Sequence, residues 1–205
     1  MADYKKTDYW QQKAKKEGYP ARSVYKLMEI DEKFHVFKPN CKLQAARILD
    51  MGAAPGSWSL FVLRKYPKSY LVSVDLSALS HEFDGNLLKG ENFKFIQGDF
   101  TDQVVRQEII SNGPYNLILS DAAPATTGNR LIDSARSLEL AETIISYAED
   151  ILAGNGNLVI KIFQSGDSPE LLKRLKNIFN SAKSYKPKAC RNESFETYYI
   201  GLGKK

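Results

Sequence analysis

Short apolar runs of strand length alternate with stretches of helical periodicity along most of this chain. The predicted strands are Ile48–Met51, Tyr70–Asp75, Phe93–Gln97, Tyr115–Ser120 and Leu158–Phe163. The predicted helices span residues 22–34, 57–65, 101–112, 133–152 and 169–180. Strands that alternate with helices in this way form a mostly parallel sheet with helices on both faces.

Two further strands, Lys183–Lys186 and Thr197–Leu202, follow without a helix between them, which predicts an antiparallel edge. The predicted fold class is therefore α/β and Rossmann-like, with a mostly parallel seven-stranded sheet, an antiparallel edge strand and helices on both faces. Because no linker divides the chain, residues 21–205 are expected to form a single domain after a polar arm at residues 1–20.

The run Ile48–Met51 breaks into a turn rich in Gly and Pro, which leads into the predicted helix at 57–65. A strand, a tight turn and a helix N-terminus form the ligand-binding crevice of open α/β sheets. Gly52 and Gly56 allow the backbone to approach a ligand closely. Their spacing after Asp50 is Asp-x-Gly-x-x-x-Gly rather than Gly-x-Gly-x-x-Gly, which favours S-adenosylmethionine over NAD. An ordinary Gly-rich connection is the alternative.

Acidic residues stand at the carboxyl ends of four predicted strands, where ligands bind in open α/β sheets. Asp75 follows Gly56 by 19 residues, a separation at which an acid holds ribose hydroxyls. Asp99 is placed to accept a hydrogen bond from an adenine amino group, although any one acid could instead cap a helix. The predicted cofactor-binding residues are Asp50, Gly52, Ala54, Pro55, Gly56, Ser57, Trp58, Asp75, Leu76, Asp99, Phe100 and Asp121.

A lysine interrupts the apolar run Leu158–Phe163 at position 161. A lysine inside a central strand is unfavourable unless its charge is paired or used. From the residues alone two interpretations stay open: the amine of Lys161 reaches a wet edge of the sheet, or it takes part in chemistry.

The first 20 residues combine lysines with aromatic side chains, and the whole chain carries a net charge of +5. Cations that bind phosphates and rings that stack on bases would make this arm an RNA contact. A solvated surface helix is an equally good interpretation. The predicted RNA-binding residues, three of them outside the arm, are Lys5, Lys6, Lys13, Lys15, Lys16, Arg22, Lys188 and Arg191.

Cysteine and histidine usage narrows the function classes. Cys41 and Cys190 give neither a disulfide framework nor metal-ligand spacing, and they suit a reducing compartment. The two histidines are isolated, so we expect no metal site and no Ser-His chemistry. The polar N-terminus has no apolar signal core, and no apolar run approaches membrane-spanning length. A cytoplasmic, monomeric protein that does not bind membranes is predicted.

Six stretches carry the motifs that point to a known family. They are Ala21–Leu27, Asp50–Trp58, Gly98–Phe100, Ser120–Pro124, Val159–Gln164 and Lys186–Ala189. In this order they resemble the FtsJ/RrmJ family of RNA ribose 2′-O-methyltransferases, and the resemblance extends from about Tyr19 to the C-terminus. It implies the Rossmann-like methyltransferase fold, S-adenosylmethionine as cofactor and RNA as substrate.

The resemblance places the family's Lys-Asp-Lys-Glu tetrad on Lys26, Asp121, Lys161 and Glu196. A ribose hydroxyl is a poor nucleophile until its proton is removed or its developing charge is stabilised. Lys161 is the candidate base, or the cation that stabilises the alkoxide. Asp121 is expected to orient Lys161, and Glu196 to position Lys26 or the hydroxyl.

The chain departs from the family's pattern at several positions. Ser57 stands where a second Gly is frequent, and Ala122 replaces a frequent Met. Phe195 replaces a common Arg and so removes a possible phosphate contact, while Glu193 competes with Glu196 for the acidic role.

The predicted function is methyl transfer from S-adenosylmethionine to a ribose 2′-hydroxyl, of a uridine in large-subunit ribosomal RNA. Transfer to tRNA by the same core is the nearest alternative, and cap methylation suits so short a chain less well. Two other classes compete: a non-catalytic RNA-binding assembly factor and an NAD-type oxidoreductase. The intact tetrad argues against the first, and the Gly spacing argues against the second.

Overall fold

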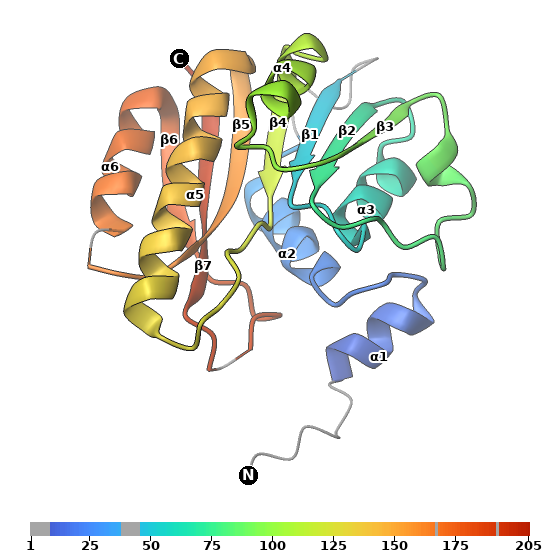
Figure 1. Cartoon of the computed structure of the whole chain (residues 1–205), viewed down its shortest axis with the longest axis horizontal. Helices are drawn as coiled ribbons and strands as arrows, with labels where there is room; N and C mark the ends of the chain where they lie inside the picture. The colour runs from blue at the N-terminus through green and yellow to red at the C-terminus, as the bar shows by residue number, and fades with distance from the viewer. Residues whose placement is uncertain (1–8, 38–45, 167, 192) are drawn as a thin grey trace.

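A single sheet organises the molecule (Figure 1), and the computed structural model describes residues 9–37, 46–166, 168–191 and 193–205. The strands are β1 (Arg47–Met51), β2 (Tyr70–Asp75), β3 (Phe93–Gln97), β4 (Tyr115–Ser120), β5 (Leu152–Phe163), β6 (Phe179–Tyr185) and β7 (Glu196–Lys204). The helices are α1 (Tyr9–Lys16), α2 (Val24–Phe34), α3 (Ser57–Lys65), the short 3₁₀ helix η1 (Leu87–Lys89), α4 (Gln103–Ser111), α5 (Arg130–Ile151) and α6 (Ser168–Ile178).

The strands form one seven-stranded sheet in the order β3-β2-β1-β4-β5-β7-β6. The pairs among β1 to β5 are parallel, whereas β7 runs antiparallel to both β5 and β6. The predicted fold class is therefore confirmed, and the antiparallel pairing lies at the β7–β6 edge. The strand order reverses between β1 and β4, and in open α/β sheets ligands bind beyond the strand ends at such a point.

Alternate residues of the central strands pack into separate cores on the two faces of the sheet. Ile48 and Val159 contact the core that contains α2 and α3. Leu49 and Ile160 contact the other core, which contains residues of α4, α5 and α6. This alternation follows from the two-residue period of side chains in a strand, and both layers are visible in Figure 1.

The largest errors among the predicted element boundaries are at the starts of β5 and β6. β5 begins at Leu152, directly after α5, and not at Leu158. The reason is an irregular start, where the β4–β5 register shifts and Asn155 has a φ of +61°. β6 begins at Phe179 instead of Lys183, because Phe179, Ser181 and Ala182 already pair with β7.

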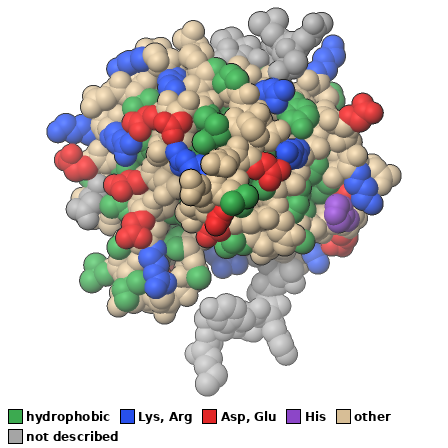
Figure 2. Space-filling model, turned by 45° about the horizontal axis from the view of Figure 1, so that its top comes forward, with side chains coloured by type: hydrophobic (Ala, Val, Ile, Leu, Met, Phe, Trp, Pro, Cys, Tyr) green, Lys and Arg blue, Asp and Glu red, His purple; other side chains and the backbone are tan. Residues whose placement is uncertain are grey.

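The surface offers no long apolar segment that would cross a membrane: none of the described helices is both long and apolar enough. On the face shown in Figure 2, Lys and Arg side chains are interspersed with Asp and Glu side chains. The predicted arm residues Lys5 and Lys6 lie outside the described residues, while Lys15 and Lys16 are exposed on α1.

Candidate active site

The carboxyl ends of β1 to β4 surround a cavity of about 380 Å³, here called the acidic cavity because carboxylates line it. A volume of this size is typical of small-molecule sites. The turn after β1 forms one wall and the loop after β4 forms another. The predicted cofactor residues that line the cavity are Gly52, Ala54, Asp75, Leu76, Asp99, Phe100 and Asp121.

Each acid at the mouth of a strand also organises the turn beside it. Asp75 Oδ2 accepts a hydrogen bond from the Ala54 amide at 2.9 Å, and its Oδ1 accepts one from the Ser77 amide at 2.8 Å. Asp99 Oδ1 accepts hydrogen bonds from the amide and hydroxyl of Thr101. The two interpretations of these acids, ligand contact and turn capping, are thus compatible, because a carboxylate oxygen has more than one lone pair.

Five of the predicted cofactor residues are not among those that line this cavity: Asp50, Pro55, Gly56, Ser57 and Trp58. Ser57 Oγ accepts a hydrogen bond from the Ala21 amide at 2.8 Å and donates one to the Ala21 carbonyl at 3.1 Å. Trp58 Nε1 donates to the Ser23 carbonyl at 2.8 Å. These side chains therefore fasten the segment before α2 to the start of α3, a role that the linear motif does not reveal.

Asp50 lies beneath the turn with no exposed surface. One carboxyl oxygen accepts a hydrogen bond from Ser59 Oγ at 2.7 Å, and that hydroxyl lies 2.9 Å from Ser73 Oγ. The other oxygen, Oδ1, is buried without a partner among the described residues. Burial raises the pKa of Asp50 to about 7; the Ser59 hydrogen bond opposes this rise, and the nearby Asp121 and Asp75 charges add to it.

Asp50 should therefore make stability depend on pH. Its folded-state pKa of about 7 lies above the ordinary value of 3.8, so the folded protein binds this proton more tightly than the unfolded chain. Stability that is fully present below about pH 4 is then lost as pH rises toward 7, by on the order of 4 kcal/mol. Asp50→Asn keeps a neutral group and should escape this loss. Urea unfolding at several pH values would measure the difference, with Glu142→Gln at an exposed position of α5 as control; a pH-independent difference would contradict the assignment.

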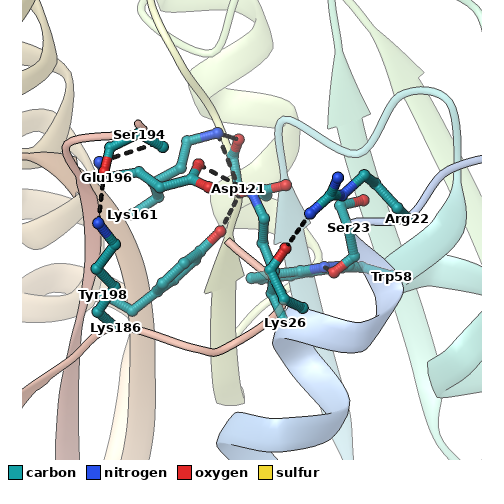
Figure 3. Close-up of polar contacts among 11 residues, drawn as sticks. Arg22, Ser23, Lys26, Trp58, Asp121, Lys161, Lys186, Ser194, Glu196 and Tyr198 are labelled. Carbon is teal, nitrogen blue, oxygen red and sulfur yellow. Dashed lines mark hydrogen bonds and ion pairs between the residues drawn. The ribbon is translucent and has the colours of Figure 1, made fainter. Parts of the chain in front are cut away.

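The four tetrad residues meet at the rim of the sheet in two ion pairs (Figure 3). Lys161 Nζ lies 3.0 Å from Asp121 Oδ1 and also donates to the Asp121 carbonyl. Lys26 Nζ donates to Glu196 Oε2 at 2.9 Å. The side chains of both lysines are about nine-tenths buried. Glu196, and not the exposed Glu193, therefore pairs with Lys26.

The charges of this tetrad stabilise one another. Burial raises the pKa of Asp121, but Lys161 and Lys26 outweigh that effect and hold it below its ordinary value. Burial lowers the pKa of Lys26, but the charges of Asp121 and Glu196 outweigh it and raise the value. Asp121 is thus a carboxylate and Lys26 an ammonium ion at neutral pH.

Tyr198 is a site residue that the sequence analysis missed. Its hydroxyl donates to Asp121 Oδ1 at 2.6 Å, and its side chain is fully buried. Burial, followed by the Asp121 charge, raises its pKa well above the ordinary value, so the phenol stays a donor. The ring also lies 5.8 Å from Lys26 Nζ and 6.0 Å from the Trp58 ring. The sequence signal that could have identified Tyr198 was strand parity, because residues two apart in a strand, such as Glu196 and Tyr198, lie on the same face.

A second cavity of about 420 Å³, here called the basic cavity, adjoins the Lys26–Glu196 ion pair of the tetrad. Lys26 and Glu196 line it together with Arg22 and Arg191. The Arg22 guanidinium donates to the Ala189 carbonyl at 2.5 Å. Burial, followed by the charge of Arg191, lowers the pKa of Arg22.

Among the other predicted RNA-binding residues that the structure describes, Lys188 precedes Ala189, which lines this cavity, and Lys13, Lys15 and Lys16 lie on α1. Glu29 accepts hydrogen bonds from the amides of Lys188 and Ala189, which fixes the loop while the Lys188 side chain stays exposed. Lys13 is engaged within the protein, 3.8 Å from Glu17 and 4.7 Å from the Tyr25 ring. Its position favours a structural role over contact with a ligand.

A family model described as FtsJ-like methyltransferase matches residues 19–204. The chain belongs to the FtsJ-like methyltransferase family. Membership confirms the resemblance, the enzyme class and S-adenosylmethionine as the cofactor, and it excludes the NAD-type oxidoreductase.

Similar proteins carry consistent names. The chain is 47% identical over 201 residues to the ribosomal RNA large subunit methyltransferase E of Treponema denticola, covering 97% of this chain and 96% of the relative. It is 43% identical over 194 residues to the enzyme of the same name from Borrelia garinii subsp. bavariensis, covering 95% of each.

Among solved structures, a ribosomal RNA methyltransferase from Plasmodium falciparum, described as putative, is 27% identical, with a TM-score of 0.73 over 91% of this chain and 98% of that chain. Human methyltransferase-like protein 13, solved in complex with SAH, is 16% identical with a TM-score of 0.59, covering 87% of this chain and 81% of that one. At that identity the second likeness concerns the fold alone.

The acidic cavity fits S-adenosylmethionine in its donor chemistry. Asp75, Asp99 and Asp121 supply acceptors for hydroxyl, amino and ammonium groups from three strand ends. Apolar side chains such as Leu76 and Phe100 complete the lining, as an adenine ring requires.

Proposed function

We propose that this FtsJ-like enzyme transfers a methyl group to a ribose 2′-hydroxyl of large-subunit ribosomal RNA. The observation that carries the proposal is the position of the tetrad between the two cavities. Asp121 lines the acidic cavity, whereas Lys26 and Glu196 line the basic one. A hydroxyl presented from the basic cavity would thus meet Lys26 and Glu196, while the cofactor residues adjoin Asp121.

The tetrad's own chemistry suits this reaction. S-adenosylmethionine, when bound, supplies a methyl group from its sulfonium. The amine of Lys161 is held by the carboxylate and the backbone carbonyl of Asp121. In its neutral form it would accept the hydroxyl proton, and as an ammonium ion it would stabilise the developing alkoxide. Lys26, held by Glu196, would place a second positive charge beside the same oxygen. Fixed alignment is the main contribution of such a site.

Asp121 is the residue on which this arrangement depends most. Its carboxylate accepts from Tyr198 and pairs with Lys161 while also facing the acidic cavity. We propose that it orients Lys161 and lies near the methyl donor. Tyr198 then acts as a positioning residue that holds the carboxylate from beneath.

The experiment is a methyl-transfer assay with labelled S-adenosylmethionine and RNA from cells that lack the protein. We expect label in large-subunit ribosomal RNA, at a site where the ribose becomes resistant to alkaline cleavage. Label in tRNA instead would favour the nearest alternative. The absence of transfer to naked RNA and to ribosomal subunits alike would favour a non-catalytic assembly factor.

We further propose that RNA binds across the basic cavity and the exposed face of α1, as part of an arm at residues 1–20. Arg22 and Arg191 would contact phosphates beside the target nucleotide. Lys15, Lys16 and Lys188 are exposed and extend this positive surface. The monomeric state and the lack of membrane attachment stay predictions.

Replacing Arg191 with Ala should weaken RNA binding several-fold and reduce the slope of log affinity against log salt by about 1. The reason is the loss of one phosphate contact at an exposed side chain. Titration of a labelled ribosomal RNA fragment at several salt concentrations measures both effects. Lys68→Ala removes an exposed cation next to the amino end of β2 and serves as the matched control. An unchanged salt slope for Arg191→Ala would remove Arg191 from the RNA surface.

A further inference from the structure

A third hollow, of about 790 Å³, lies between the first halves of α5 and α6 and is not used by the tetrad, the cofactor residues or the basic cavity. Its walls are partly apolar, with Leu131, Leu138 and Pro169. Ser134 and Gln164 add a hydroxyl and an amide to the lining. A hollow with apolar walls and a few polar groups is suited to a small planar molecule or group.

The rings of Phe163 and Phe195 are 4.7 Å apart with their planes inclined by 59°, and the Arg130 guanidinium lies 5.2 Å from the Phe195 centroid; these three side chains are together called the stack. Arg130 also lines the hollow, so the stack forms part of its rim. Both rings are half-buried and therefore present some surface to solvent.

The stack adjoins the reacting groups directly. Phe163 follows Lys161 by two residues and shares its face of β5, while Phe195 immediately precedes Glu196. The separation along the strand is about 7 Å, which is the scale of a neighbouring nucleotide rather than of the target ribose itself. Phe195 is also the position at which the sequence departs from the family's common Arg.

We propose that the stack of Arg130, Phe195 and Phe163, together with the hollow behind it, binds an unpaired nucleobase next to the methylated nucleotide. This inference rests on the proposed RNA methyltransferase function and names the form of RNA that the site takes. Aromatic rings and arginine planes are the groups on which proteins stack unpaired bases. A phosphate is a poorer occupant, because Arg130 is the one cation among the described lining residues and Glu139 is also present.

Charge substitutions on α5 give a matched pair of variants. Leu131 is 83% exposed and lines the hollow, whereas Ile132 is 44% exposed and does not. Leu131→Glu and Ile132→Glu add the same charge to the first turn of the same helix, so both should fold. We expect Leu131→Glu to raise the KM for RNA about tenfold with unchanged affinity for S-adenosylmethionine, and Ile132→Glu to change KM less than twofold.

A double-mutant cycle identifies the occupant. Wild-type protein and Phe195→Ala are titrated with the RNA substrate and with RNAs that carry an abasic ribose at each position flanking the methylated one. At the position that the stack holds, wild type should lose about tenfold in affinity on removal of the base. Phe195→Ala should lose no more than twofold in affinity at that same position, because the ring on which the base would stack is already absent.

The outcomes separate this inference from the proposed function. Methyl transfer by wild type to the unmodified RNA tests the function alone. If transfer occurs but the two losses are additive at every flanking position, the nucleobase site is refuted and the function stands. If Leu131→Glu impairs activity on ribosomal subunits but not on naked RNA, the hollow binds a protein, and the inference is likewise refuted.

Discussion

Replacing Lys161 with Ala should reduce the rate of methyl transfer by about a thousandfold, while affinity for S-adenosylmethionine changes little. Its amine is the group that contacts both the carboxylate and the carbonyl of Asp121 at the rim of the acidic cavity. Loss of a general base or of a fixed charge beside a developing alkoxide each gives effects of about this size. Single-turnover kinetics with labelled cofactor measure the chemical step, and calorimetric titration measures cofactor binding.

The control for this variant is Lys183→Ala, which removes an exposed lysine from β6 of the same sheet. It should leave the chemical step within about twofold of wild type, since its amine lies on the surface. Turnover of Lys161→Ala at the wild-type rate would remove Lys161 from the chemistry. Loss of cofactor affinity in parallel with rate would instead indicate that Asp121 had moved.

Replacing Gly52 with Ala should destabilise the protein by about 3 kcal/mol and weaken cofactor binding more than tenfold. Gly52 has a φ of +78°, and an added Cβ would lie 2.5 Å from the Ala122 Cα and 2.7 Å from its amide nitrogen. Backbone atoms cannot swing aside as the end of a flexible side chain can. The turn after β1 and the loop after β4 would therefore have to separate, and both line the acidic cavity.

Gly128→Ala serves to separate the effect of backbone strain from the effect of the steric clash with Ala122. Gly128 has a φ of +83°, but an added Cβ there has no neighbour within 4 Å. Its substitution should cost about 1 kcal/mol from strain alone and leave cofactor affinity unchanged. Urea denaturation and cofactor titration of both variants measure the comparison. Equal effects of the two substitutions would show that the approach of Gly52 to Ala122 has no importance.

The parallel part of the sheet could be predicted from sequence because its inner strands β1, β2 and β4 are buried on both faces and form apolar runs. The same logic placed Asp75, Asp99 and Asp121 at one rim, since parallel strands end on the same side. The tetrad residues, in contrast, were brought together by resemblance, because no local pattern joins Lys26 to Glu196 across 170 residues.

What the sequence could not provide was the direction of side chains within a motif. Ser57 and Trp58 belong to the glycine-rich motif but point to the segment before α2. Asp50 lies one residue before the end of β1, and strand parity directs its side chain beneath the turn toward Ser59. Tyr198 was missed because an aromatic residue in a terminal strand resembles ordinary core until its hydroxyl partner is known.

The anchoring of the segment before α2 has a consequence for how the enzyme responds to its ligands. Ser57 and Trp58 join the helix that follows the cofactor turn to the residues that lead into Lys26. A displacement of that helix on cofactor binding would be transmitted to an ammonium group on the RNA side. Since such linkage is reciprocal, RNA engaged at Lys26 would in turn change the affinity for the cofactor by the same factor.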